Sequence, residues 1–478
     1  MLAKMWIGGK AVPAASGRTF PVVNPADGRV LAQVAEGSAI DIDRAVEAAA
    51  RAAAGPWGNM SPRERARVLF SVARLVRERL GELALLETRN AGKPLTDARD
   101  EIGLVADCFE YYAGAVSKHF GETIPVGAPG LNFTLREPVG VCGLIVPWNY
   151  PAVIASWKLA PALACANTVV LKPSPETPLT ALALARLCSE AGVPDGVLNV
   201  VPGPGPGCGS ALVEHSRVRK ISFTGSTATG TSIMRAAADG IKRVSLELGG
   251  KSPNIVFEDA DLDLCVEKAT WSVFSNAGQD CCARSRALVH RKVYDRFVDG
   301  LVSRAKRIVV GHPEKKGTQV GPLISQRQRE RVCAYIASGK AEGAELLCGG
   351  ARPGGTLSKG YYLTPAVFAG AEDNMKIVRE EIFGPVVCVI PFKDEEEAIR
   401  LANDSVYGLS ASLWTRDVGR VLRVSRAVQS GVISVNSSSS VHLEAPFGGY
   451  KSSGLGRELG VKALDLYCEV KNVFISSV

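Results

Sequence analysis

Two adjacent cysteines, Cys281 and Cys282, follow a polar stretch of the sequence, and the first has the setting of a nucleophile. A cysteine inside an apolar run is usually a small buried hydrophobe. Here the preceding Asn-Ala-Gly-Gln-Asp cannot pack as the interior of a buried helix. A thiolate adds reversibly to a carbonyl carbon, and the adduct of an aldehyde can then lose a hydride. The residue types therefore predict covalent chemistry at Cys281.

Glu247 stands at the end of an apolar run and is followed by Leu248 and two glycines. Burial of a carboxylate raises its pKa and suits it to act as a general base on water. The alternative is a salt bridge with a nearby lysine or arginine, which is the common role of a single glutamate. Glu247 is thus a candidate base with a structural role left open.

Asn149 lies in the segment Pro147-Trp-Asn-Tyr-Pro151, where two prolines fix the turn. An amide donates hydrogen bonds without ionising, which suits an oxyanion hole, and loss of one such donor costs about 3 kcal/mol. Asparagine is also common in ordinary turns. We therefore expect Asn149 to be either an oxyanion donor or a turn residue.

Two glycine-rich turns each follow a predicted strand and precede a predicted helix. The turn at 202–209 does not match GxGxxG because position 208 is cysteine, so an ordinary turn is an equal alternative. In the turn at 223–230, Gly225 allows close backbone approach and Ser226 sits where a helix N-terminus can meet a phosphate. Two such turns in one sheet favour a dinucleotide site.

The elements that must position these residues form two α/β series that meet near Gly249-Gly250. Strands that alternate with helices predict parallel sheets with helices on both faces. The first series has strands at 140–146, 167–171, 197–201, 220–223 and 243–248, and helices up to 157 and at 178–191, 209–215 and 226–238. The second has strands at 254–257, 385–391, 411–414 and 431–436, and helices from 261 and at 394–403 and 417–427.

Three further segments are predicted outside these series. Ser61-Pro-Arg-Glu64 has the pattern of a capping box and begins a helix. The stretches 123–136 and 469–476 have the character of strands.

Composition excludes several classes of protein. The chain has 478 residues, of which 46% are apolar and 22% charged, so it can bury a large core. Its net charge of +8 is spread without a basic run, so no nucleic-acid partner is expected. It has neither a signal-peptide pattern nor an apolar run long enough for a membrane span. Twelve scattered cysteines without a CxxC pair indicate the cytoplasm, and five histidines without a ligand pair predict no metal site.

Taken together, these segments resemble the aldehyde dehydrogenase superfamily, in its non-acylating, NAD(P)+-dependent form. The motifs that carry the resemblance are LELGGKSPNIVF, GQDCCA, PWNYP, FTGS, EEIFGPV and PFGGYKSSGLGRELG, in the family's order. The resemblance implies an α/β, aldehyde dehydrogenase-like fold with two stacked Rossmann-like domains and a small bridging β-sheet. The implied ranges are 1–119 and 139–249 for the cofactor domain, 250–452 for the catalytic domain, and 120–138 with 466–478 for a bridge that makes a homodimer or homotetramer.

The resemblance also assigns residues to roles. It implies Cys281 as nucleophile, Glu247 as base, Asn149 as oxyanion donor, and Lys158 and Glu458 as residues that position water and relay protons. The implied cofactor-binding residues are Val146, Pro147, Trp148, Lys172, Ser174, Gly203, Gly207, Gly225, Ser226, Gly230, Leu248, Glu381 and Phe383. The implied substrate residues are Tyr150, Ile154, Trp157, Asp280, Cys282, Ser439, Val441 and Phe447, within or near a loop at 437–441.

The sequence departs from the family at the cofactor's ribose. NAD-preferring members often carry a glutamate three residues after the position of Lys172, but here Pro175 stands there and Glu176 follows. Loss of that carboxylate weakens discrimination against a 2′-phosphate. We expect NAD, with NADP left open. The presence of Glu247 argues against a coenzyme A-acylating variant, in which hydrolysis would be wasteful.

The aromatic residues at 150 and 157 suggest a medium-chain or aromatic aldehyde as substrate. Two rival functions differ in kind. A non-catalytic binding protein on this scaffold would be expected to lack Cys281 or Glu247, and both are present. A thiol hydrolase that ignores nucleotides would leave Lys172 and the glutamate at 381 without a role.

Overall fold

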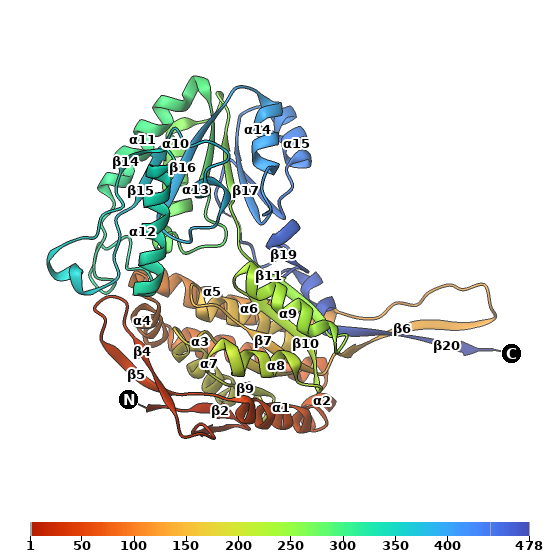
Figure 1. Cartoon of the computed structure of the whole chain (residues 1–478). Coiled ribbons are helices and arrows are strands. Elements are labelled where there is room, and N and C mark those ends of the chain that lie inside the picture. The colour runs from red at the N-terminus through yellow and green to blue at the C-terminus, as the bar shows by residue number, and fades with distance from the viewer. Residues whose placement is uncertain (1, 440, 478) are drawn as a thin grey trace.

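The first domain of the computed structural model, which describes residues 2–439 and 441–477, is built on an eight-stranded sheet (Figure 1). The strand order is β19-β11-β10-β7-β8-β9-β2-β3. The five strands from β11 to β9 are parallel, while β19, β2 and β3 pair antiparallel with their neighbours. The bounds are β2 (Met5–Ile7), β3 (Lys10–Val12), β7 (Val141–Ile145), β8 (Thr168–Lys172), β9 (Leu198–Val200), β10 (Val218–Thr224), β11 (Arg243–Glu247) and β19 (Gly454–Leu455).

The strand order of this sheet contains a topological switch point. The chain runs outward from β7 to β8 and β9, and then returns to place β10 on the other side of β7. The loops after β7 and β10 therefore diverge, and such a crevice is where open α/β sheets bind ligands. Asn149 lies in the first loop and Gly225 begins the second. The fold thus brings together two turns that the sequence analysis singled out separately.

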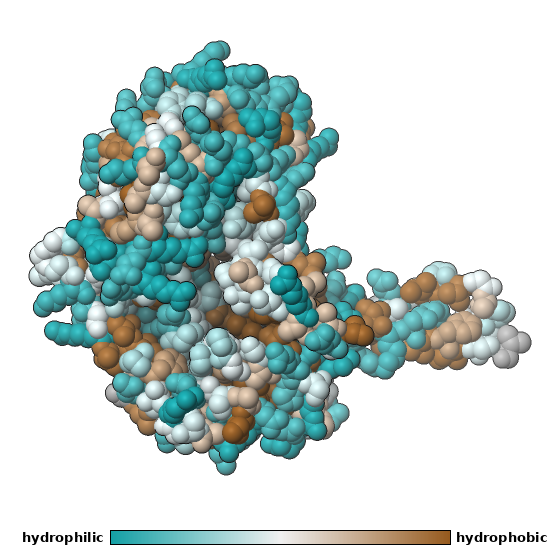
Figure 2. Space-filling model, viewed as in Figure 1, coloured by the Kyte–Doolittle hydropathy of each residue, from teal (hydrophilic) through white to brown (hydrophobic). Residues whose placement is uncertain are grey.

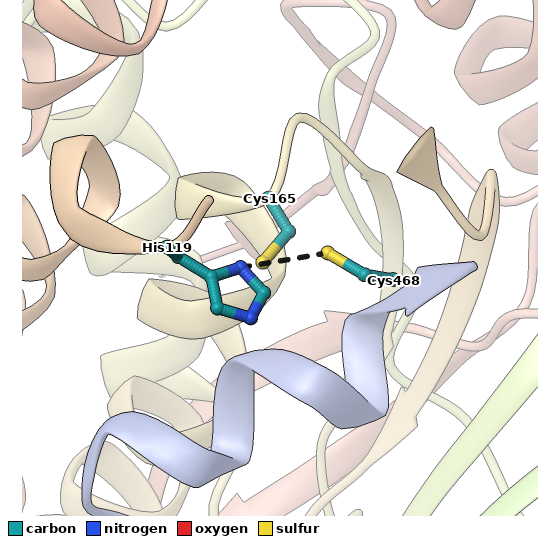
Figure 3. A group of neighbouring side chains, drawn as sticks. All are labelled: His119, Cys165 and Cys468. Atoms are coloured by element: carbon teal, nitrogen blue, oxygen red, sulfur yellow. Dashed lines mark hydrogen bonds between the residues drawn. The ribbon is translucent and has the colours of Figure 1, made fainter. Parts of the chain in front are cut away.

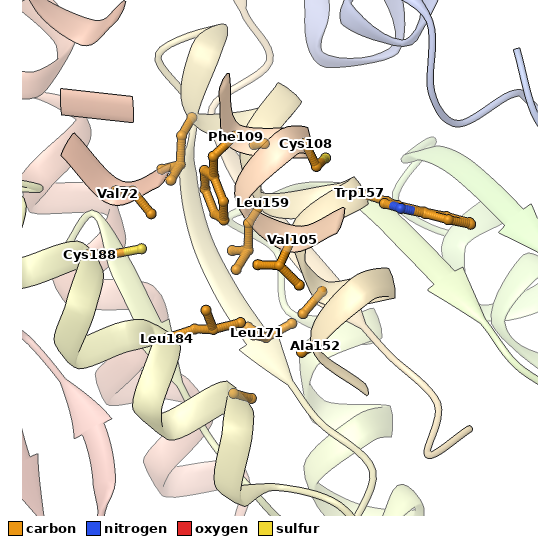
Figure 4. Close-up of a cluster of buried hydrophobic side chains, with 14 of the residues drawn as sticks. Val72, Val105, Cys108, Phe109, Ala152, Trp157, Leu159, Leu171, Leu184 and Cys188 are labelled. Carbon is orange, nitrogen blue, oxygen red and sulfur yellow. The ribbon is translucent and has the colours of Figure 1, made fainter. Parts of the chain in front are cut away.

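Helices cover both faces of this sheet and form the largest apolar core. Figure 4 shows part of it, where Val72, Phe109, Leu159, Leu171 and Leu184 meet from four helices and one strand. Ser61 begins one of these helices with the predicted capping box, which is confirmed. The helices are α1 (Ala39–Ala53), α2 (Pro56–Asn59), α3 (Pro62–Glu78), α4 (Leu80–Ala91), α5 (Leu95–Ala115), α6 (Pro151–Ala164), α7 (Leu179–Glu190), α8 (Ser210–Glu214) and α9 (Thr227–Ala238).

The second domain contains a seven-stranded sheet of order β14-β15-β16-β13-β12-β17-β18, parallel except for β14. The chain enters it directly after β11, across Gly249 and Gly250. The strands are β12 (Pro253–Val256), β13 (Arg286–His290), β14 (Glu345–Cys348), β15 (Ala366–Ala369), β16 (Val386–Phe392), β17 (Ser410–Trp414) and β18 (Val432–Val435). The helices are α10 (Leu262–Phe274), α11 (Tyr294–Arg307), α12 (Gln326–Ala341), α13 (Lys376–Arg379), α14 (Glu395–Asn403) and α15 (Val418–Ala427).

A two-stranded antiparallel arm, β6 (Gly130–Pro138) with β20 (Cys468–Ser476), projects from the first domain (Figure 1). The prediction of a strand over 123–136 is wrong at its start, because only an isolated bridge between Thr123 and Phe133 precedes the regular strand. The first residues of the chain form β1 (Leu2–Ala3), which joins β4 (Thr19–Val23) and β5 (Val30–Ala35) in a separate sheet.

The described part of the chain contains no helix with the length and apolar character needed to cross a membrane.

Candidate active site

A cavity of about 330 Å³ lies between the two domains and is lined by residues of both. The surface is hollowed between the domains in Figure 2. From the first domain come Asn149 and Glu247, and from the second comes Cys281. The three residues predicted to carry the chemistry therefore face one cavity, although they come from the loop after β7, the end of β11 and the loop that follows α10.

The loop that carries Cys281 is held in a rare backbone conformation. Asn276, Ala277 and Gly278 have φ values of 50°, 55° and 70°, all in the left-handed region. Alanine seldom adopts it, and such backbone persists only where surrounding contacts hold it. At Gly278 an added Cβ would lie 2.1 Å from the Gly384 carbonyl oxygen, so only glycine fits. Contacts with neighbouring segments such as Gly384 therefore fix the backbone of residues 276–278, which immediately precede the Cys281 loop.

Side-chain amides tie this loop to Asn149. Nδ2 of Asn276 donates to the carbonyl oxygens of Asn149 and Gln279, at 3.0 and 3.2 Å. Nδ2 of Asn149 donates to the Gln279 carbonyl at 3.0 Å, which leaves that amide a second N–H. The buried Lys93 also donates to the Asn149 carbonyl, at 2.9 Å. The network fixes the amide beside the nucleophile's loop, and the sequence analysis missed both Lys93 and Gln279 as parts of it.

Replacement of Asn276 tests this positioning. In Asn276→Ala the loop loses two hydrogen bonds, and we expect kcat to fall by about 10- to 100-fold because the thiol is no longer held in register. KM for the aldehyde should change little, and Asn276→Asp should lose at least as much rate as Asn276→Ala, because a carboxylate cannot donate to the two carbonyl oxygens and faces them with negative charge. Stopped-flow kinetics of the first turnover measure the effect. The matched control is Asn403→Ala, a remote asparagine that bonds the Ala427 carbonyl. Equal losses in the two variants would contradict a positioning role.

Glu247 is buried, and neither oxygen of its carboxyl group has a hydrogen-bond partner among the described residues. Burial, followed by the charge of Glu458, raises its pKa well above the ordinary value. The alternative of a salt bridge is not seen in the described structure, where the carboxyl group lies against Gly448 instead. Burial of a carboxyl group without a hydrogen-bond partner costs folding free energy. Such groups are typical of sites that bind a ligand or perform catalysis.

Lys158 and Glu458 form a buried ion pair behind Glu247. Ser222 joins them, since Nζ of Lys158 donates to its Oγ at 3.1 Å and this hydroxyl donates to Glu458 at 3.3 Å. Lys158 is the main charge that opposes the rise in the pKa of Glu247. The two residues implied to relay protons thus lie together and act electrostatically on the candidate base.

Cys281 is partly exposed to the cavity, whereas Cys282 is buried. The hydrogen bond with Cys282, burial, and the charges of Asp280 and Glu381 raise the pKa of Cys281 well above its ordinary value. Of the two adjacent sulfurs, that of Cys281 is therefore the one that a ligand in the cavity can reach.

Glu381 and Phe383 lie on the second domain's side of the cavity. A carboxylate oxygen of Glu381 accepts a hydrogen bond from the Gly250 N–H at 2.9 Å, and a Cβ at Gly249 would lie 2.5 Å from the same side chain. The ring of Phe383 packs edge-on against Trp148, with centroids 5.2 Å apart. These contacts join the two domains at the cavity, as expected for residues that hold a ligand between them.

The other implied cofactor residues divide into two groups. Pro147, Trp148, Gly225, Ser226 and Leu248 line the cavity. The remaining implied residues, Val146, Lys172, Ser174, Gly203, Gly207 and Gly230, do not.

Close packing explains two of the glycines outside the cavity lining. A Cβ at Gly203 would lie 2.9 Å from the Gly37 carbonyl oxygen, and one at Gly230 would lie 2.5 Å from Leu248. Lys172, at the end of β8, is buried, and its Nζ donates to the Pro173 carbonyl at 3.1 Å. Of the three, only Gly230 contacts a residue that lines the cavity, which is Leu248.

Several cavity residues were missed by sequence reasoning. α12 presents its first turn to the cavity through Ser325, Arg327, Gln328 and Arg331. Ser325 caps that helix by accepting a hydrogen bond from the Gln328 N–H at 3.2 Å. The available signal was a Ser-x-x-Gln pattern at 325–328, which marks the start of a helix but not a ligand site. The others missed are Glu176, Thr224, Gly249 and Ile324.

The implied substrate residues gather at the first domain's core beside Cys281. Tyr150, Ile154, Trp157, Cys282, Val441 and Phe447 belong to one apolar cluster that includes Cys281. The rings of Trp157 and Phe447 lie 5.3 Å apart. Nε1 of Trp157 is buried without a hydrogen-bond partner in the described structure. Asp280 is also nearby and accepts the Cys282 N–H at 2.9 Å, while Ser439 lies in a loop whose residue 440 falls outside the described residues.

A doubly wound sheet and a cavity at its switch point bring a thiol, an amide and a carboxyl group together in an α/β protein. The model of the aldehyde dehydrogenase family matches residues 12–473, and the chain belongs to this family. The resemblance, the fold class and the expected class of enzyme, an NAD(P)+-dependent aldehyde dehydrogenase, are thereby confirmed.

Individual relatives agree with this. The structure of an aldehyde dehydrogenase from Bacillus cereus in complex with NAD+ is 48% identical, with a TM-score of 0.98 over 100% of this chain and 97% of that one. The mitochondrial aldehyde dehydrogenase of Rattus norvegicus is 47% identical over 97% of this chain and 89% of its own. The mitochondrial benzaldehyde dehydrogenase of Antirrhinum majus is 47% identical over 98% and 88%.

Proposed function

We propose that the protein oxidises a medium-chain or aromatic aldehyde to its carboxylic acid with NAD+, through a thioester on Cys281. The observation that carries the proposal is the shared cavity of Cys281, Asn149 and Glu247. A thiol alone is common in proteins, but a thiol that faces both an amide donor and an unpaired buried carboxyl group is equipped for acyl chemistry.

Each residue then has one task. The Cys281 sulfur attacks the aldehyde carbon as the thiol proton passes to water in the cavity, and the second N–H of the Asn149 amide stabilises the oxyanion. When bound, NAD+ supplies the acceptor for the hydride of this adduct. Glu247 takes a proton from water as the water attacks the Cys281 thioester, which releases the acid and restores the thiol. Lys158 and Glu458 carry that proton away from Glu247.

The residues present fit a dinucleotide cofactor. Ser226 caps α9, so the positive end of that helix faces the cavity and suits a pyrophosphate. Arg327 and Arg331 add positive charge from the opposite wall. Glu381 would hold the nicotinamide ribose, and Phe383 with Trp148 would support the ring. The Bacillus cereus relative was solved with NAD+, and this supports the same cofactor here.

Glu176 is our candidate for the carboxylate that Pro175 displaces. It lines the cavity, and the Ser174 hydroxyl donates a hydrogen bond to it. A carboxylate at this place favours the ribose 2′-hydroxyl of NAD+ over the 2′-phosphate of NADP+. The proposal therefore keeps NAD+ as the preferred cofactor in spite of the departure from the family pattern.

Steady-state production of NADH and NADPH across a panel of aldehydes tests both proposals together. We expect benzaldehyde and hexanal to be better substrates than betaine aldehyde or a dicarboxylic semialdehyde, and NAD+ to be preferred. Glu176→Gln should raise the ratio of NADP+ to NAD+ efficiency by about 10-fold, since it removes one charge that repels the 2′-phosphate. Preference for a charged aldehyde would contradict the substrate, and an unchanged ratio would contradict the role of Glu176.

The arm supports a proposal about assembly. Its exposed side chains include Leu131, Val470, Phe474 and Ile475, each at least 43% exposed. Figure 2 shows hydrophobic surface along the projecting arm. Since exposed apolar patches of this kind mark interaction sites, we infer that residues 120–138 and 466–478 bridge copies of the chain in a homodimer or homotetramer.

A further inference from the structure

Three potential metal ligands meet far from the active site, beneath the base of the arm. His119 follows α5 and a short 3-10 helix, Cys165 caps the end of α6, and Cys468 begins β20. Their ligand atoms all lie within 4.8 Å of one another. Figure 3 shows the three side chains directed toward a common point. The sequence analysis expected no metal site because these residues are widely separated in the chain, and the fold brings them together.

The distances approach those of a metal site. A tetrahedral zinc ion places its sulfur ligands about 3.8 Å apart, and a sulfur and a nitrogen ligand about 3.6 Å apart. Nδ1 of His119 lies 3.9 Å from Sγ of Cys468. A shift of a few tenths of an ångström would therefore admit the ion between them. A cavity of about 240 Å³ adjoins the cluster and leaves room for water as a fourth ligand.

The second ring nitrogen of His119 has the partner that metal-bound histidines use. Nε2 lies 2.8 Å from a carboxylate oxygen of Asp465. A carboxylate there keeps the proton on Nε2 and leaves the lone pair of Nδ1 directed at the two sulfurs, which is the carboxylate–histidine–metal arrangement. Asp465 is itself fixed by Arg136, whose Nη1 lies 2.5 Å away.

The charges that face the cluster suit two thiolates and one divalent cation. Arg65 and Arg136 line the adjoining cavity, and Asp465 lies behind the histidine. The two cysteine thiolates and Asp465 carry three negative charges, and Arg65 and Arg136 carry two positive charges. A divalent cation would bring the total charge of this group from one negative to one positive.

We propose that His119, Cys165 and Cys468 bind a zinc ion that fastens the base of the arm to the first domain. Two sulfurs and one imidazole nitrogen form a borderline-soft donor set, which favours zinc over magnesium or calcium. Binding would replace the two thiol protons, which leave to solvent. This site is independent of the dehydrogenase reaction, so the two proposals can fail separately.

Cobalt(II) is the spectroscopic probe for the test, added to metal-free, untagged full-length protein. We expect one equivalent to give an intense thiolate-to-cobalt absorption in the near ultraviolet, and zinc to displace it. The absorption should vanish in Cys165→Ser and in Cys468→Ser. It should remain in Cys188→Ser, a matched buried cysteine, and in Cys281→Ser/Cys282→Ser, which disrupts the other group of potential ligands at Asp280.

Two measurements avoid the risk that a cysteine variant fails to fold. Asp465→Asn keeps all three ligands and should weaken zinc binding by about 10- to 100-fold. X-ray absorption at the zinc edge of the unmodified protein should report two sulfurs with nitrogen or oxygen neighbours. The proposal is overturned if cobalt gives no thiolate absorption, if the absorption depends on Cys281 and Cys282, or if Cys165 and Cys468 are recovered as a cross-linked disulfide peptide.

Discussion

Cys281→Ala is expected to lower kcat for aldehyde oxidation by at least about 10,000-fold, because it removes the one described thiol that lines the cavity. Alanine fits the space of the thiol, so the fold and cofactor binding should persist. The variant should still quench its tryptophan fluorescence when NAD+ is added, since Trp148 lines the cavity. Steady-state NADH production measures the loss, and mass spectrometry of the quenched wild-type reaction should find the acyl group on Cys281.

The matched control is Cys348→Ser, a partly buried thiol on β14 that lies outside the cavity. It should keep the activity of the parent enzyme. Because the pKa of Cys281 is raised, alkylation of this thiol by iodoacetamide should be slow at neutral pH and accelerate as the pH rises. Substantial activity in Cys281→Ala, or acylation of Cys282 in its place, would contradict the assignment of the nucleophile.

Glu247→Gln should separate the two halves of the reaction. Glutamine has the size of glutamate but cannot accept a proton from water, so we expect hydrolysis of the thioester to slow by about 100- to 1,000-fold. The first turnover should still release close to one NADH per active site as a burst. Stopped-flow absorbance at 340 nm resolves the burst from the slow turnover that follows it.

The pH dependence gives the same assignment a second test. Glu247 is active as a carboxylate, and burial raises its pKa. The rate of hydrolysis in the parent enzyme should therefore increase as the pH rises above the ordinary range of a glutamate, and this increase should be absent in Glu247→Gln. Glu258→Gln, a partly buried carboxyl group beside Arg420, is the control. Equal losses in the Cys281 and Glu247 variants, with no burst in either, would contradict the division of labour.

The central residues of the site were predictable because their neighbours in sequence are unusual. Polar residues before Cys281, glycines after Glu247 and prolines around Asn149 each depart from core composition. Alternating patterns likewise predicted β7 to β11 and most of the second sheet. The order of the strands could not be predicted, because it depends on pairing between segments that are far apart in the sequence. The switch point beside Asn149 follows from that order and was therefore not predicted either.

What the sequence could not supply are contacts between segments that are far apart. Lys93 reaches the Asn149 carbonyl from the loop between α4 and α5, and its neighbours in the chain give no sign of it. Arg331 belongs to a helix whose polar pattern is that of any solvated surface. The meeting of His119 with Cys468 depends on the path of nearly the whole chain. Residues of this kind are selected by the tertiary structure alone.

The pairing of β19 with β11 determines when the active site can form during synthesis of the chain. Glu247 lies beside Gly454 in that pair, so a ribosome has made most of the chain before the strand that flanks the base exists. The nascent first domain carries an open sheet edge until then, which is a hazard for association with other chains. A truncation that removes Gly454 and all residues after it should therefore leave an inactive, aggregation-prone product, because β11 then lacks its partner β19.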